Sequence, residues 1–400
     1  MKEKSSGQFK IGVVTTVYFP YSHADVIVSR WLQPRPDDVV WGWPKPRTKI
    51  KTMCVEQFAP EDLSRGLCEE HGVPLYGSVA EALCDGSDAL AVDAVLLIGE
   101  HGEYPRNDLE QKLYPRKELF DKITDVFRAS GCSVPVFCDK HLSWNFDWAL
   151  EMDRTARQMG FMLISSSALP FCRRVPPVDL AGNKTIDEAV AVFHGPDECY
   201  GYHSFEFAQA ILERRTKGET GVEAVTVHRG EDALRRLDDG TCSADLMDAA
   251  LEALAQQDPK KINGGNLRDN CRNAHQMPTT IVFEYCDGMR VTHVNLSGHI
   301  RGFGAAMRTQ NGKSICTAPY FDDATHFHAH FATMSRIVED AFLSNRPPFA
   351  PQRSLVTAGM TTFMMQARAN PGVRLATPKL RIAYAPLMEG GGLSLNGKDR

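Results

Sequence analysis

Two hydrophobic patterns alternate along roughly the first 170 residues. Runs that are apolar almost throughout, such as residues 10–17 (KIGVVTTV), 91–100 (AVDAVLLIGE) and 135–140 (PVFCDK), are typical of strands buried on both faces. Between them, apolar residues recur at helical spacing, as in residues 24–32. Strands alternating with helices predict a Rossmann-like, doubly wound parallel sheet, and we assign it to a first domain, residues 1–170.

The second half of the chain changes character. Residues 279–298 and 305–318 predict two hairpins that turn at Asp287-Gly288 and Asn311-Gly312. Together with helical patterns near the C-terminus, they predict an α+β domain with a large, mainly antiparallel sheet, residues 171–385. Residues 386–400 are rich in glycine, and we expect a flexible tail there.

Composition and charge exclude several classes of partner. The net charge is −5 and the pI is about 6.2, which argues against nucleic acid and anionic membranes. No apolar run reaches the ~18 residues that would cross a bilayer, and the N-terminus has no secretory signal pattern. The 11 cysteines form no C-x-x-C pair, so we expect reduced thiols in a cytoplasmic protein.

Four segments in a fixed order carry a family resemblance. They are CEEHGVPLYGSVAEAL, VFCDKHLSWNFDWALEMDRTARQMGFML, CYGYHSFEFAQAI and NRPPFAPQRSLVTAGMTTFMMQARANPGVRL. Their order resembles the Gfo/Idh/MocA-like oxidoreductases, the family of glucose-fructose oxidoreductase and inositol dehydrogenase. The likeness runs from residue 9 to about residue 385. It implies a nucleotide-binding first domain and a second domain that binds substrate and forms a homo-oligomer through its sheet.

The first turn departs from that family. The Gly-x-Gly-x-x-Gly positions fall on Thr15, Val17 and Pro20, and the following histidine on His23. In the standard site these glycines permit a tight turn and a close approach of the pyrophosphate. Hydroxyls of this segment can contact an anion instead, and the candidate cofactor contacts here are Thr15, Thr16, Tyr18, Ser22 and His23. Whether NAD(P) still binds stays open.

Residues 48–56 (TKIKTMCVE) predict the second strand of the first domain, and Glu56 ends it. The resemblance places a carboxylate there on the adenosine ribose, which would favour NAD over NADP, because a 2′-phosphate would be repelled. The alternative, a solvated loop glutamate, stays open.

The resemblance implies two catalytic residues. Lys140, in CDKH, corresponds to the lysine that reaches the substrate hydroxyl. His203, in CYGYHSFEF, corresponds to the histidine that takes the proton, and its unperturbed pKa of about 6.5 suits that role. The family has an aspartate four residues before this histidine; here Cys199 stands there, with Glu198 beside it as a further catalytic candidate. A packed core histidine is the alternative for His203.

Polar residues after predicted strands and near the second domain's hairpin supply candidate substrate contacts. They are His101, Glu103, Arg106, His141 and His299. Arg106 can clamp a carboxylate or phosphate. Histidines 101, 141, 203 and 299, with Glu103 or Glu198, would suit zinc or manganese, and His326 and His330 would share a helix face. No spacing forms a recognised metal motif.

Three functions remain. The first is an oxidoreductase acting on a sugar, a polyol or a related hydroxyl or carbonyl compound. The second is a lyase, isomerase or hydrolase on the same scaffold, without redox use of NAD and with or without a metal. The third is a non-catalytic binding or assembly protein.

Overall fold

The computed structural model describes residues 8–35, 38, 43, 45–180, 184–321, 328 and 330–387. His326 and the predicted tail from residue 388 onward lie outside these residues. The chain divides into two compact units. Unit 1 comprises Met1–Pro105, Lys112–Ala168 and Phe321–Pro351, and unit 2 comprises Arg106–Gln111, Leu169–Tyr320 and Gln352–Arg400.

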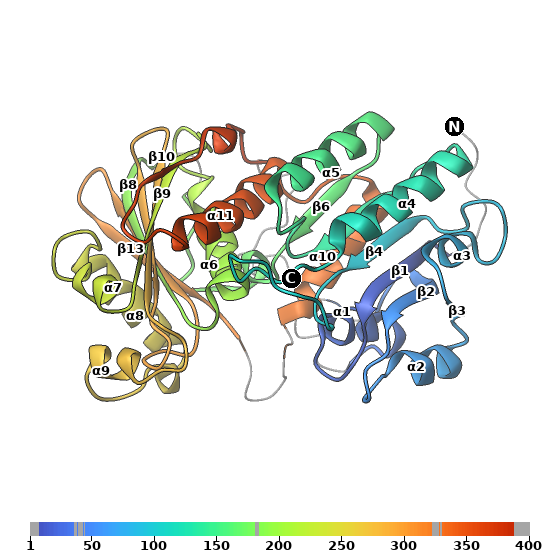
Figure 1. The fold of residues 1–400 in the computed structure, drawn as a ribbon, viewed down its shortest axis with the longest axis horizontal. Helices are drawn as coiled ribbons and strands as arrows, with labels where there is room; N and C mark the ends of the chain where they lie inside the picture. The colour runs from blue at the N-terminus through green and yellow to red at the C-terminus, as the bar shows by residue number, and fades with distance from the viewer. Residues whose placement is uncertain are drawn as a thin grey trace. The chain divides into compact units, whose positions relative to one another are not determined.

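Unit 1 is built on a six-stranded parallel sheet in the order β3-β2-β1-β4-β5-β6. Its strands are β1 (Lys10–Val17), β2 (Lys49–Gln57), β3 (Leu75–Tyr76), β4 (Ala94–Ile98), β5 (Val136–Asp139) and β6 (Leu163–Ser166). Its helices are α1 (His23–Leu32), α2 (Ser64–His71), α3 (Val79–Cys84), α4 (Arg116–Ser130), α5 (Phe146–Met159) and α10 (His330–Ser344). Helices α1 and α2 cover one face of the sheet and α4 and α5 the other (Figure 1). The Rossmann-like prediction is confirmed.

Local signals explain several boundaries in unit 1. Helix α2 ends at Gly72, whose φ of 63° lies in the left-handed region that glycine tolerates. Helix α3 begins after Ser78, whose hydroxyl accepts a hydrogen bond from the backbone N–H of Glu81. Both boundaries follow from the residue types found there, a glycine and a serine.

Unit 2 contains an eight-stranded sheet in the order β14-β9-β10-β11-β8-β12-β13-β7. Its strands are β7 (Arg174–Val175), β8 (Ile186–Phe193), β9 (Val222–Arg229), β10 (Thr279–Tyr285), β11 (Arg290–Asn295), β12 (Gly304–Thr309), β13 (Ser314–Pro319) and β14 (Leu375–Ala376). Every pairing is antiparallel except that of β8 with β11. Both predicted hairpins, β10–β11 and β12–β13, are present, and the mainly antiparallel sheet is confirmed.

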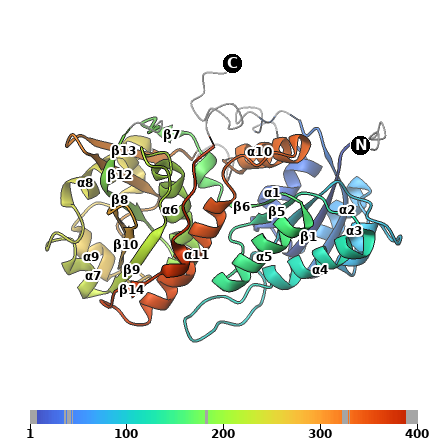
Figure 2. The same ribbon diagram turned by 90° about the horizontal axis from the view of Figure 1, so that it is seen from above.

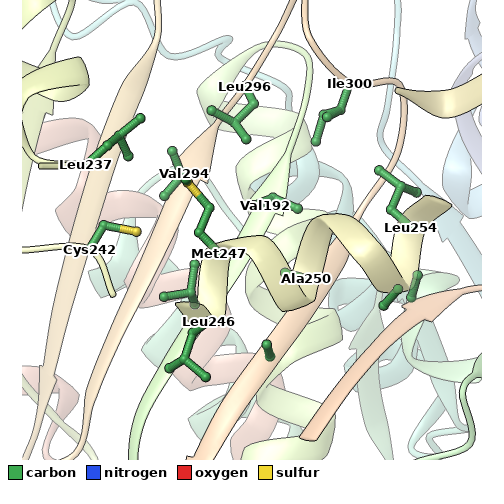
Figure 3. Close-up of a cluster of buried hydrophobic side chains, with 14 of the residues drawn as sticks. Val192, Leu237, Cys242, Leu246, Met247, Ala250, Leu254, Val294, Leu296 and Ile300 are labelled. Carbon is green, nitrogen blue, oxygen red and sulfur yellow. The ribbon is translucent and has the colours of Figure 1, made fainter. Parts of the chain in front are cut away.

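Helices cover both faces of this second sheet. They are α6 (Asp197–Leu212), α7 (Glu231–Arg235), α8 (Ala244–Gln257), α9 (Leu267–Arg272) and α11 (Gln352–Arg368). Helices α6 and α11 lie on one face, and α7, α8 and α9 on the other (Figures 1 and 2). Leu246, Ala250 and Leu254 of α8 pack on Val192 and Val294 of the sheet, as Figure 3 shows. This apolar face of the second sheet is therefore covered by the chain's own helix.

Two further expectations can be compared with the structure. None of the 11 cysteines is in a disulfide, as expected for reduced thiols. Among the described residues, no helix has both the length and the apolar character needed to cross a membrane.

Candidate functional site

Three strands of unit 1 bring polar residues to the carboxyl edge of the sheet. His23 begins α1 after β1, Glu100 and His101 follow β4, and Asp139 ends β5 just before Lys140. Because β1 and β4 are neighbours whose helices lie on opposite faces, this edge is the switch point where doubly wound sheets bind ligands. The strand order therefore assembles these residues at the position where chemistry is expected.

His23 and Asp139 form a close pair. Nδ1 of the imidazole lies 2.6 Å from Oδ2 of the carboxylate, and the carboxylate side chain is 1% exposed while the imidazole is 13% exposed. The ring of His101 lies 5.3 Å from that of His23, and Phe331 contacts His23 edge-on at 5.5 Å between ring centres. Because the carboxylate contacts Nδ1, it sets the tautomer and leaves Nε2 as the nitrogen for other chemistry.

A buried ion cluster lies beside this pair. Nζ of Lys140 lies 3.2 Å from Oε1 of Glu100, and Arg116 donates to the other carboxylate oxygen. Burial by itself would raise the pKa of Glu100, but the charges of Lys140 and Arg116 outweigh it and hold that pKa well below its usual range. Gly99 is required here, because a Cβ on it would lie 2.5 Å from Cγ of Arg116.

Arg116 is only partly satisfied by this carboxylate. Its side chain is buried, and its Nε and Nη1 have no hydrogen-bond partner among the described residues. Its guanidinium stacks over the ring of Tyr114 at 4.9 Å. The cluster thus holds donors that Glu100 alone does not saturate.

The two other histidines at this edge are kept neutral. Burial, together with the neighbouring charges of His23 and Lys140, lowers the pKa of His101 to about 4. Burial also lowers the pKa of His141 well below its usual value, and Arg116 adds to the effect. Both rings are therefore uncharged at neutral pH and can contribute polar contacts but no positive charge.

The β1–α1 turn uses its own polar groups. The hydroxyls of Thr15 and Thr16 donate to the carbonyls of Ile98 and Glu100, at 3.1 and 2.8 Å. The Tyr18 hydroxyl lies 2.7 Å from Oγ of Ser29. In the structure these three side chains therefore bind the end of β4 and the inner face of α1. Their predicted contact with a cofactor stays a prediction.

The N-terminus of α1 already carries a carboxylate. Ser22 caps the helix by accepting from the N–H of Asp25 at 3.2 Å, and Asp25 accepts from the N–H of Tyr21 at 2.8 Å and from Ser29 at 2.6 Å. A pyrophosphate in the standard pose would meet this buried negative charge where a helix N-terminus normally attracts anions. The residues present do not fit that pose.

An open cleft of about 520 Å³ lies at the ends of β1 and β2, between α3 and α4. Val14, Val55, Leu119 and Val126 supply apolar walls, and the polar lining residues are Thr15, Glu56, Ser78, Lys122 and Asp125. Glu56 accepts a hydrogen bond from the hydroxyl of Tyr104. The size and the mixed lining suit a planar heterocycle with a ribose.

The loop after β4 is shared between the units. Glu103 of unit 1 is exposed and exchanges backbone hydrogen bonds with the Gln57 side chain, at 2.9 and 3.2 Å. Arg106 belongs to unit 2, where its Nη1 lies 3.8 Å from a carboxylate oxygen of Glu198 on α6. Two predicted site residues are thus brought together in unit 2.

His203 lies one turn further along α6 and is partly exposed. Its ring lies 6.0 Å from Tyr200 and 6.1 Å from Phe303, while His194 contacts the same two aromatic rings. His299 is instead engaged by Asn270 of α9, at 3.1 Å from its Nδ1. The aromatic surroundings of His203 suit the C–H faces of a sugar ring.

The metal hypothesis gains no support. No group of three or more His, Cys, Asp or Glu among the described residues is arranged to hold a metal ion. His101 and His141 belong to unit 1, and His203 and His299 to unit 2.

Four buried residues of the unit 1 edge were not predicted as site residues: Asp25, Glu100, Arg116 and Asp139. Glu100 and Asp139 had a usable signal, since each directly follows or ends an apolar strand. Arg116 had none, because its role depends on the packing of α4 against the end of β4.

No protein-family model matches this sequence, and neither does any curated protein. Solved structures do match its fold. GenD2 from gentamicin A biosynthesis, in complex with NAD, is 13% identical with a TM-score of 0.57, over 94% of this chain and 99% of that chain. An Agrobacterium radiobacter oxidoreductase in complex with NAD+, L-tartaric acid and magnesium is 12% identical with a TM-score of 0.56, over 92% and 98%.

The apo scyllo-inositol dehydrogenase of Lactobacillus casei is 10% identical with a TM-score of 0.56, over 93% of this chain and 99% of that chain. At these identities the likeness shows the fold, and it covers both units. The chain therefore shares the fold of these three proteins over 92 to 94% of its length.

Proposed function

We propose that this chain is an oxidoreductase that acts on a hydroxyl or carbonyl group of a sugar, a polyol or a related compound. The observation that carries the proposal is a set of acid–base side chains at the ligand edge of a fold that is similar, over 92 to 94% of the chain, to GenD2 with bound NAD and to an oxidoreductase with bound NAD+. Lys140 would hold the substrate oxygen, and His203 with Glu198 would serve proton transfer from unit 2. His141, His299 and Arg106 remain proposed substrate contacts.

The cofactor we propose is NAD(P), which when bound supplies the hydride acceptor. Its adenosine would occupy the cleft between α3 and α4, with Glu56, Ser78 and Lys122 as polar contacts. Since the N-terminus of α1 carries Asp25, the pyrophosphate would not take the standard pose. Glu56 would favour NAD, because its carboxylate repels a 2′-phosphate.

The test is a fluorescence titration of the protein with NADH and NADPH, joined to a turnover assay with NAD and a polyol panel. We expect NADH to bind more tightly than NADPH, and Glu56→Gln to weaken NADH binding about tenfold, the loss of one charged hydrogen bond. Glu61→Gln, at an exposed position that does not line the cleft, is the control. Lys140→Ala should abolish turnover while leaving NADH binding intact.

A second candidate is a non-redox lyase, isomerase or hydrolase. The observation that favours it is the carboxylate of Asp25 at the helix terminus, since this opposes the standard dinucleotide pose. Absence of binding with both NADH and NADPH would reject the oxidoreductase and leave this candidate.

A further inference from the structure

The His23–Asp139 pair has the geometry of a proton-transfer dyad. The carboxylate is fully buried and lies 2.6 Å from Nδ1, so it holds the ring in one orientation and stabilises the positive charge of a protonated imidazole. The imidazole is the more exposed partner. A histidine that acts as a base in this way needs Nε2 to be reachable by the substrate and Nδ1 to be held by another group.

A purely structural role explains the pair less well. The N-terminus of α1 is already capped by Ser22 and carries the carboxylate of Asp25, so the helix does not need His23 as a cap. A single hydrogen bond to Asp139 could be made by an amide side chain of the same reach. What an imidazole adds to such an amide is a second ring nitrogen that can accept a proton.

The surroundings of His23 define the ligand chemistry. The two cations Lys140 and Arg116 face the two carboxylates Glu100 and Asp139, and His101 is neutral, so the fixed charges around His23 balance. Phe331 lies against His23 and Phe19 against His101, both edge-on at 5.5 Å. Balanced charge with aromatic walls suits an uncharged polyhydroxyl compound better than a phosphorylated one.

We propose that unit 1 carries its own catalytic base, with Nε2 of His23 accepting the proton of a substrate hydroxyl and Asp139 positioning the ring. The substrate O–H bond breaks, an N–H bond forms at Nε2, and the electron pair stays on the oxygen. The nearby ammonium of Lys140 favours that developing negative charge. The inference rests on the proposed function in taking the substrate to be a hydroxyl compound, and it assigns to His23 the acceptance of the proton that was given above to His203.

The first test requires no turnover. The full chain is treated with diethyl pyrocarbonate, which acylates neutral imidazole nitrogens, and the modified histidines are identified by peptide mass spectrometry with myo-inositol or scyllo-inositol present or absent. We expect rapid modification at His23, slower modification in Asp139→Asn, and protection by at least one polyol. Modification at the exposed His275 serves as the internal control and should not respond to either change.

The second test uses the turnover assay of the proposed function. His23→Asn keeps a donor for Asp139 but has no basic nitrogen, so kcat should fall by about 100-fold or more, and the pH profile of kcat/KM should lose the limb that reports the base. His275→Asn is the matched control and should keep wild-type turnover.

The outcomes separate the two proposals. The wild-type protein could be inactive with NAD while its His23 reacts with diethyl pyrocarbonate and is protected by a polyol. That result would reject the oxidoreductase proposal and support the dyad. Full turnover and an unchanged pH profile in His23→Asn reject the dyad and leave the oxidoreductase standing. An unreactive His23, or a reactive one that no polyol protects, also overturns the dyad.

Discussion

At the scale of single residues, the most consequential group is the buried carboxylate of Glu100. It is the shared anion of Lys140 and Arg116, and all three side chains are buried. In Glu100→Gln two buried cations lose their counter-charge, so we expect the free energy of unfolding to fall by about 3 to 5 kcal/mol. Urea denaturation measures this loss, with Glu118→Gln on the exposed side of α4 as the control.

The same carboxylate predicts a dependence of stability on pH. Its folded-state pKa lies below the unfolded value of about 4.3, so the unfolded chain takes up the proton first as pH falls. The contribution is therefore complete above about pH 4.3 and is lost as pH falls through the folded-state pKa. Unfolding free energies measured between neutral and acidic pH should show a smaller acid loss in Glu100→Gln. An equal loss in both proteins would contradict the assignment.

Residue identity was only partly readable from the sequence. Lys140 and His101 could be nominated because each lies next to a predicted strand end, and His23 because it aligns with the histidine of the resembled family's first turn. Their partners could not, since His23 and Asp139 are 116 residues apart and meet only through the order of the strands.

At the scale of elements, the contact between α8 and β12 depends on one glycine. A Cβ on Gly304 would lie 2.5 Å from the backbone carbonyl oxygen of Ala250, and a backbone atom cannot turn aside as a side chain can. We expect Gly304→Ala to destabilise the protein by about 1 to 3 kcal/mol through overpacking. Thermal unfolding followed by circular dichroism checks this.

Gly264→Ala is the control for this substitution, because nothing lies within 4 Å of a Cβ there. If both variants melted at the same temperature as the wild type, α8 would not pack on the sheet as closely as described.

Most helices and strands were predictable from the sequence, but helix α8 was not predicted. Both hairpins carried Asp-Gly or Asn-Gly at the turn, and the strands of unit 1 were continuous apolar runs. Helix α8 is not among the elements predicted above, although Leu246, Ala250 and Leu254 recur at helical spacing. What no pattern revealed is the face of the second sheet that this helix covers.

At the scale of the whole molecule, unit 1 is completed by a distant part of the chain. Glu339 of α10 accepts hydrogen bonds from the backbone N–H groups of Arg47 and Thr48, at 2.7 and 2.9 Å, and from Nε1 of Trp43 at 3.0 Å. Its side chain is 0% exposed. In Glu339→Ala these buried donors lose their acceptor, so we expect a loss of about 3 kcal/mol and faster amide exchange at Thr48.

The measurement is urea unfolding with hydrogen exchange read by mass spectrometry. Glu118→Gln again serves as the unaffected control. Unchanged exchange around Thr48 would mean that α10 does not secure the start of β2.

Assembly belongs to this scale as well. A homo-oligomer formed through the second sheet remains a prediction, and the helices on both faces restrict how it could form. A subunit contact would have to use the sheet's edges or the outer surfaces of α6, α8 and α11.

By itself, the sequence determined the types of element and their order, because hydrophobic periodicity and turn residues act over a few positions. It therefore predicted the parallel sheet, the mainly antiparallel sheet and the strand ends that carry His101 and Lys140. Tertiary structure alone decided that His23 meets Asp139, that Asp25 occupies the helix terminus, and that residues 321–351 join unit 1. These are contacts between residues far apart in the chain or set by side-chain direction, and their energies depend on burial and distance that no local pattern encodes.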